Sequence, residues 1–110
     1  MRLRVLALLA VALAGCGGPG GCRPAAAVVE NASATPIEQF YMAPDGTADW
    51  GADLLSADLP SGASLPFRFA GAGRTVLRVV WADGRAMELP GVDGCAIRRV
   101  TVSDAGMQAR

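Results

Sequence analysis

Between about residue 27 and residue 103, short apolar runs alternate with turns rich in Gly, Pro, Asp and Ser. Apolar residues at every second position place their side chains on one face of a β-strand. The first run, 27–31, ends at a turn signal, Asn31-Ala32-Ser33. This part of the chain contains no stretch of ten or more residues at helical spacing. The pattern therefore predicts an all-β domain.

We expect six or seven short strands in a small antiparallel β-sandwich or partly open barrel. The clearest candidates are residues 27–31, 35–42, 65–69, 75–82, 85–89 and 95–102. The run 75–82 is apolar on both faces, which indicates a central strand. Asp83-Gly84 follows it directly and predicts a hairpin with a type I′ turn.

The segments between and after these strands carry weaker signals. Residues 90–94 form a Pro- and Gly-containing stretch that we interpret as a loop. Residues 50–55 are compatible with one helical turn, for which Asp49 would be the N-cap. Residues 104–110 show no pattern, and we expect this tail to be frayed.

The first sixteen residues differ from the rest of the chain. Arg2 and Arg4 precede an unbroken apolar run at 5–14. Ten apolar residues are about half of what a membrane-spanning helix needs, but they suit the apolar region of a signal peptide. We expect residues 1–15 to be a signal peptide that is removed from the mature protein.

The residues Leu13-Ala14-Gly15-Cys16 resemble a lipobox, the cleavage site of bacterial lipoprotein signal peptides. The resemblance implies that Cys16 carries a lipid and becomes the mature N-terminus. Three acyl chains would anchor the protein firmly, because each buried methylene contributes about 0.8 kcal/mol. Two alternatives stay open: Ala12-Leu13-Ala14 also fits the signal peptidase that releases soluble proteins, and the run could belong to a core helix. The Gly- and Pro-rich residues 17–21 argue against a continuing helix.

We divide the mature chain into a lipidated cysteine with a Gly/Pro-rich tether (16–26), a β domain (27–103) and the tail. The chain has three cysteines: Cys16, Cys22 and Cys95. If Cys16 is acylated, two thiols remain in an oxidising compartment, so we expect a Cys22–Cys95 disulfide. The alternative is that Cys22 stays free in the tether.

Three stretches of the domain resemble a family of small exported bacterial β-sandwich-like proteins of unknown function. They read WGADLL, LRVVWADG and GVDGC, and they begin at Trp50, Leu77 and Gly91. The resemblance implies a small β-sandwich and export, but no activity. Family members often carry a cysteine shortly before the second stretch. This chain has none at 72–74, which leaves Cys22 as the candidate partner of Cys95.

Two groups of residues are candidate binding sites. Four aspartates crowd one segment and could supply oxygens to Ca²⁺, although a solvated, turn-forming loop explains them as well. These are Asp45, Asp49, Asp53 and Asp58. Aromatic residues are enriched at recognition sites, so we also consider Trp50 and Tyr41, together with Phe67 and Trp81, as a binding patch. The alternative places them in the core, which we favour for Trp81, while Trp50 is interpreted as a core residue or loop anchor.

Composition limits the possible functions. Ten Arg balance ten acidic residues, and the chain has no His. A nucleic-acid-binding surface is therefore not expected, and the commonest general base is missing. The serines have neither His nor Lys to activate them, so we do not expect an enzyme. Arg98 and Arg99 could touch anionic lipid, although a solvated strand end explains them equally.

We therefore expect a lipid-anchored, non-catalytic binding or structural module of the bacterial cell envelope. Gly17, rather than Asp, follows Cys16. By analogy with Gram-negative sorting, this places the protein on the periplasmic face of the outer membrane. The expected partners are the membrane and an envelope protein or glycan, with no cofactor besides the covalent lipid. The alternatives are a small periplasmic inhibitor of a cell-wall enzyme and a Ca²⁺-dependent module. The sequence leaves the oligomeric state open.

Overall fold

The computed structural model describes residues 23–24, 26–71 and 73–110. The expected signal peptide, Cys16 and Cys22 lie outside these residues. Seven strands are present in the described part of the chain. They are β1 (Ala26–Asn31), β2 (Ile37–Pro44), β3 (Ser64–Arg68), β4 (Arg74–Trp81), β5 (Ala86–Asp93), β6 (Arg99–Val102) and β7 (Met107–Ala109).

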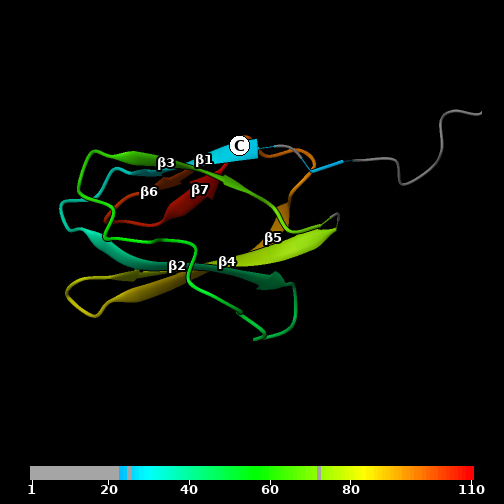
Figure 1. Cartoon of the computed structure of the whole chain (residues 1–110), viewed down its shortest axis with the longest axis horizontal. Coiled ribbons are helices and arrows are strands. Elements are labelled where there is room, and N and C mark those ends of the chain that lie inside the picture. The colour runs from blue at the N-terminus through cyan, green and yellow to red at the C-terminus, as the bar shows by residue number, and fades with distance from the viewer. Residues whose placement is uncertain (1–22, 25, 72) are drawn as a thin grey trace, which may run out of the picture.

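The strands form two sheets that face each other as a small β-sandwich (Figure 1). One sheet has the order β3-β1-β6-β7 and the other has the order β2-β4-β5, so β4 is central as predicted. The prediction of an all-β sandwich is confirmed. One pairing departs from the expected antiparallel pattern, because β1 and β6 are parallel neighbours. These strands are far apart along the chain, and local turn signals do not reveal their pairing.

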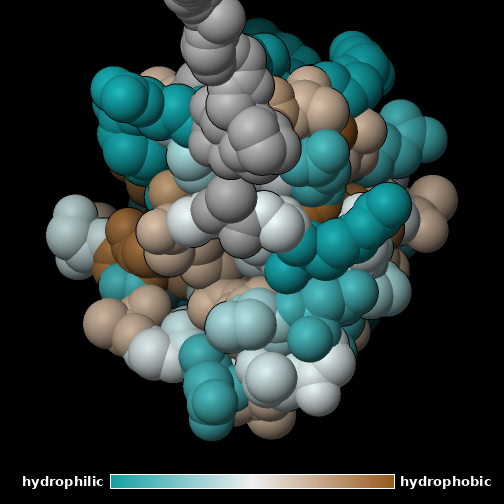
Figure 2. Space-filling view, turned by 90° about the vertical axis from the view of Figure 1, so that its right-hand side faces the viewer, coloured by the Kyte–Doolittle hydropathy of each residue, from teal (hydrophilic) through white to brown (hydrophobic). Residues whose placement is uncertain are grey.

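Strand direction defines two ends of the sandwich. At the tether end β1 begins, β3 ends at Arg68 opposite Ala26, and β4 begins at Arg74. At the far end lie the β4–β5 turn and the β6–β7 turn. Figure 2 looks onto the tether end.

The core fills the space between the two sheets. Val29, Val100 and Val102 of the first sheet are fully buried, as are Leu77 and Val79 of the second. Removing this apolar surface from water is the main driving force for the fold. Three phenylalanines extend the core toward the β2 and β3 edges: Phe67 packs edge to face on Phe40 and Phe69, with ring centroids 5.1 Å apart in each pair.

A buried polar network lies at the far end, where the chain crosses from β1 to β2. The Oδ1 atom of Asn31 accepts the backbone N–H and the hydroxyl of Ser33, at 3.0 and 2.6 Å. The Nδ2 atom of Asn31 donates to the carbonyls of Thr35 and Leu59, at 2.9 and 3.0 Å. The indole N–H of Trp81 donates to the Ser33 hydroxyl at 2.9 Å. Buried polar groups are costly unless paired, so this network specifies how the crossing segment sits over the core.

The β4–β5 hairpin is present as predicted, but its turn differs from type I′. The N–H of Gly84 donates to the carbonyl of Trp81 at 2.9 Å, and the N–H of Trp81 donates to the carbonyl of Arg85 at 2.8 Å. These bonds enclose three residues, with Gly84 at φ 92°. A three-residue loop needs a left-handed residue only at its last position, and glycine supplies it without steric cost.

Two further expectations about the elements are wrong. Residues 90–94 were expected to be a loop, but β5 continues to Asp93. β5 is an edge strand, so Pro90, which has no N–H to donate, can lie within it. Gly91 has a φ of 71° and lies where the register between β4 and β5 shifts. The last predicted strand, 95–102, is shorter than expected, because β6 begins at Arg99.

The tail is paired rather than frayed. Met107 lies opposite Val102 in β7, and its side chain is buried against the core. The serine-to-glycine turn that precedes it is closed by the N–H of Ser103, which donates to the carbonyl of Gly106 at 2.8 Å. β7 thereby covers an edge of β6 that would otherwise expose unpaired backbone groups.

Candidate functional site

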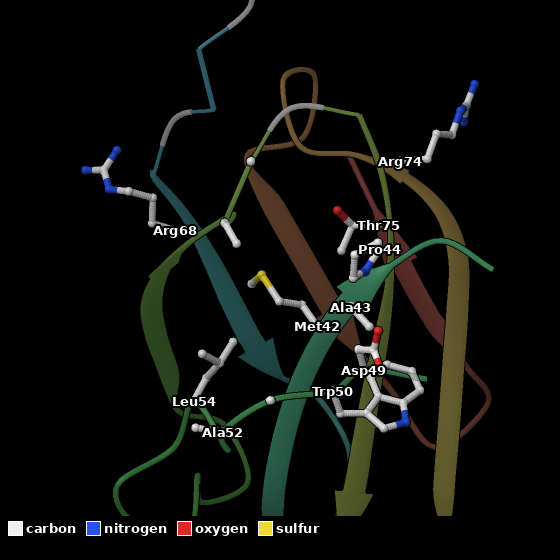
Figure 3. A pocket seen from close by; sticks show the side chains of 13 residues that line it. Met42, Ala43, Pro44, Asp49, Trp50, Ala52, Leu54, Arg68, Arg74 and Thr75 are labelled. Carbon is white, nitrogen blue, oxygen red and sulfur yellow. The ribbon is translucent and has the colours of Figure 1, made fainter. Parts of the chain in front are cut away.

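An apolar groove with a volume of about 530 Å³ opens between the β2 and β3 edges, toward the tether end. Its lining comes from the ends of β2 and β3, the start of β4, the β2–β3 connection and the β3–β4 connection. Met42 and Leu54 project into the space between the two edges (Figure 3). This volume lies within the range typical of small-ligand sites, and a mainly apolar lining is usual for them.

The charged side chains around the groove lie at its rim. Arg68 and Arg74 contribute to the lining, but their guanidinium groups point away from it (Figure 3). The Arg74 guanidinium donates to the carbonyl of Gly91 at 2.8 Å. Asp49 lies next to Trp50, on the side of β2 opposite Met42 and Leu54 (Figure 3). The interior of the groove therefore offers contacts for apolar groups rather than for charged ones.

The wall of the groove is held in place by Asp53. Its Oδ1 atom accepts the backbone N–H of Phe40 at 2.9 Å and that of Leu55 at 3.0 Å. The N–H of Leu54 in turn donates to the carbonyl of Phe40 at 2.8 Å. The carboxylate thus replaces a neighbouring strand along the free edge of β2. The predicted helical turn over 50–55 is wrong: the described residues there contain no helix, and the aspartate that bonds the backbone is Asp53 rather than Asp49.

Trp50 and Tyr41, the predicted aromatic binding residues, both lie next to Arg78. The guanidinium carbon of Arg78 is 5.9 Å from the centroid of a Trp50 ring, and Tyr41 is opposite Arg78 in the β2–β4 register. Arg78 also forms an ion pair with Glu88 at 2.7 Å. Trp50 lines the groove, whereas Tyr41 does not. Trp81 is a core residue, as expected.

The structure gives the four predicted Ca²⁺ ligands separate surroundings. Asp53 is committed to the β2 edge, and Asp45 accepts the N–H of Gly91 at 3.4 Å. Asp49 lines the groove, and Asp58 is exposed beside Leu59. Among the described residues, no group of three or more acidic or cysteine side chains could hold a metal ion. Ca²⁺ binding stays a prediction.

The clearest perturbed acid lies at the far end, away from the groove. The backbone N–H of Arg85 donates to Asp83 at 3.0 Å and is the largest influence lowering the pKa of that carboxyl. The guanidinium of Arg85 adds a 2.9 Å ion pair to the same residue, which raises its own pKa. Arg85 also stacks over Trp81 at 4.5 Å. This cluster closes the hairpin. None of its residues lines the groove.

Cys95 is disulfide-bonded, and its partner is not among the described residues. The pairing with Cys22 therefore stays a prediction, as does lipidation of Cys16. Sequence reasoning missed Leu54 and Met42 as groove residues. A signal was present for Leu54: in the pair Leu54-Leu55 only one side chain can face the core, and Leu55 is the buried one.

Two observations on the whole chain complete the description. Within the described residues, no helix is long and apolar enough to cross a membrane. Scans against protein-family models, curated proteins and solved structures found no match. The resemblance to small exported bacterial β-sandwich-like proteins therefore stays a prediction.

Proposed function

We propose that this protein is a lipid-anchored, non-catalytic binding module of the bacterial cell envelope, and that it binds its partner through the groove. The anchor would be the lipid on Cys16 of the lipobox-like segment. The observation that carries the binding role is the groove itself: an apolar space of about 530 Å³ at the open edge of the sandwich.

The lining favours a protein partner over a glycan. Met42, Trp50 and Leu54 offer apolar contact area, while the guanidinium groups at the rim point outward. A glycan presents many hydroxyl groups that need hydrogen-bond partners when buried, and an apolar groove supplies few of them. A partner side chain of Leu, Met or Phe type would instead gain from burial, at roughly 25 cal/mol per Å² of apolar area.

The groove can be tested with an uncharged apolar fluorophore, N-phenyl-1-naphthylamine, titrated into the purified lipoprotein. We expect saturable binding at one site, with energy transfer from Trp50. Leu54→Asp should weaken binding at least tenfold, because it places a charge in the groove. The matched control is Ala57→Asp, which adds the same charge at an exposed position of the same connection, outside the groove lining. Equal affinities for the two variants would refute the assignment of the groove.

Partner and anchor need separate measurements. A photo-crosslinking residue at position 54 should give one defined protein adduct in cells, and the same residue at position 57 should not. Lipidation is tested by intact mass and palmitate labelling. Cys16→Ser should abolish both signals, whereas Cys22→Ser should leave them and change only the disulfide. If Cys16→Ser leaves labelling and membrane fractionation unchanged, the proposed anchor is wrong.

A further inference from the structure

The arginines of the domain divide into two groups according to their partners. Arg78, Arg85 and Arg99 form all the ion pairs found among the described residues. The others have no carboxylate within ion-pairing distance in that part of the chain. These are Arg23, Arg68, Arg74, Arg98 and Arg110.

All five of these arginines lie at or near the tether end. Arg23 precedes β1, and Arg68 is opposite Ala26, the first residue of β1. Arg74 begins β4 at the same end. The backbone places the remaining two there as well: the carbonyl of Arg98 accepts the N–H of Val28 at 3.0 Å, and the N–H of Arg98 donates to the carbonyl of Arg110 at 3.0 Å. Figure 2 shows long hydrophilic side chains on several sides of this end.

The end of the sandwich opposite the tether is richer in acidic residues. Glu38, Asp58, Asp83 and Asp104 lie toward the far end, where Arg85 forms ion pairs with Asp83 and Asp104. The tether end also carries carboxylates close to the arginines. They are Asp93, which accepts the N–H of Cys95 at 2.9 Å, Asp45, and Asp49, which lines the groove together with Arg68 and Arg74. The domain is therefore polarised along the strand direction, with its positive end toward the tether.

We infer that the tether end docks on the anionic headgroups of the membrane to which the chain is anchored. This inference rests on the proposed lipid anchor. After Cys16 the tether has ten residues (17–26), which span at most about 35 Å when extended. The anchor therefore holds the positive end, and not the negative one, close to the lipid surface. Arginines with no carboxylate partner keep their full charge for lipid phosphates, which they bind in a bidentate manner.

Docking would also set the orientation of the groove. The groove opens toward the tether end between β2 and β3, so its entrance would lie close to the headgroups. The far end, with the β4–β5 and β6–β7 turns, would point away from the bilayer. A partner that enters the groove would then have to approach along the membrane surface.

The test uses the intact lipoprotein, isotopically labelled and inserted into nanodiscs that carry a gadolinium-chelating lipid. Nanodiscs of phosphatidylcholine alone are compared with nanodiscs containing three parts in ten of phosphatidylglycerol, since the two differ in surface charge. In anionic nanodiscs we expect loss of the amide signals of residues 94–98, with retention of those of residues 82–85. In neutral nanodiscs, where only the tether keeps residues 94–98 near the surface, the difference between the two groups should be much smaller. Added salt should weaken the selective loss, because it screens the attraction.

A matched pair of variants separates docking from net charge. The double variant Arg68→Gln, Arg98→Gln removes two charges from the tether end and should abolish the selective loss; each arginine near an anionic surface contributes about a fivefold factor in binding. The double variant Arg78→Gln, Arg85→Gln removes the same charge elsewhere and should retain the selectivity. Equal signal loss in both residue groups, or equal effects of both variants, would overturn the inference. A mature chain without lipid would instead overturn the anchor, and the inference with it.

Discussion

Replacing Ser33 by Ala tests whether the buried network at the far end stabilises the fold. Ser33 is 3% exposed, and its hydroxyl accepts the indole N–H of Trp81 while donating within the network. Alanine fits the available space, so the change removes hydrogen bonds without creating a clash. The perturbation therefore isolates the polar contribution from the packing of the core.

The expected cost follows from the groups that lose their partners. Leaving the buried indole N–H of Trp81 without an acceptor costs about 1–3 kcal/mol. The Oδ1 atom of Asn31 keeps the backbone N–H of Ser33 at 3.0 Å, so the loss of its second bond costs less, about 0.5–1 kcal/mol. We expect a total of about 2–3 kcal/mol. For a domain of this size that corresponds to a fall in Tm of about 10–20 °C.

The assay is unfolding by heat and urea, followed by circular dichroism, together with a double-mutant cycle. Ser56→Ala is the control, because Ser56 is exposed and its side chain makes no hydrogen bond within the described residues. In a Trp81→Phe background the indole N–H is absent, so Ser33→Ala should cost about 1–2 kcal/mol less than in the parent chain. A Ser33→Ala cost below about 0.5 kcal/mol, or no coupling to Trp81→Phe, would refute the reasoning.

Three further predictions follow from the fold. Gly94→Ala should lower stability by about 1–3 kcal/mol, because its Cβ would lie 2.9 Å from the Phe69 ring; Gly106→Ala, which has open space, should be close to neutral in the same urea titration. Removal of residues 104–110 should lower Tm and increase aggregation measured by light scattering, because the edge of β6 loses its cover. In an NMR titration the pKa of the Asp83 carboxyl should lie below its ordinary value. The stabilisation that ionised Asp83 gives the fold should be present above the ordinary pKa and lost as the pH falls through the lowered pKa. An unshifted titration midpoint would contradict the hydrogen bond from the Arg85 backbone.

Local patterns in the sequence were sufficient for the all-β class and for most strands. The run 75–82 is apolar on both faces, and it became the central strand of its sheet. The dipeptide Asp83-Gly84 predicted the hairpin because glycine at a left-handed position is a local requirement of the backbone. The burial of Trp81 followed from the need of a small domain to cover its largest side chains.

Pairings between distant segments had no such local signal. The parallel contact of β1 with β6 and the addition of β7 depend on which edges are left to be covered once the sheets have formed. For the same reason Pro90-Gly91 resembled a loop, although an edge strand tolerates both residues.

The candidate site shows the same difference between features set by local sequence and features set by the packing of distant segments. The sequence by itself determined the segment that carries Trp50 and the aspartates, and it determined the number and type of charges. Only the tertiary structure decided that Asp53 binds the β2 edge and that Leu54 faces a groove. It also decided that five arginines without an ion pair among the described residues share one end. The physical reason is that hydrophobic periodicity reports which face of a strand is buried, whereas a site depends on how separate strands are placed side by side.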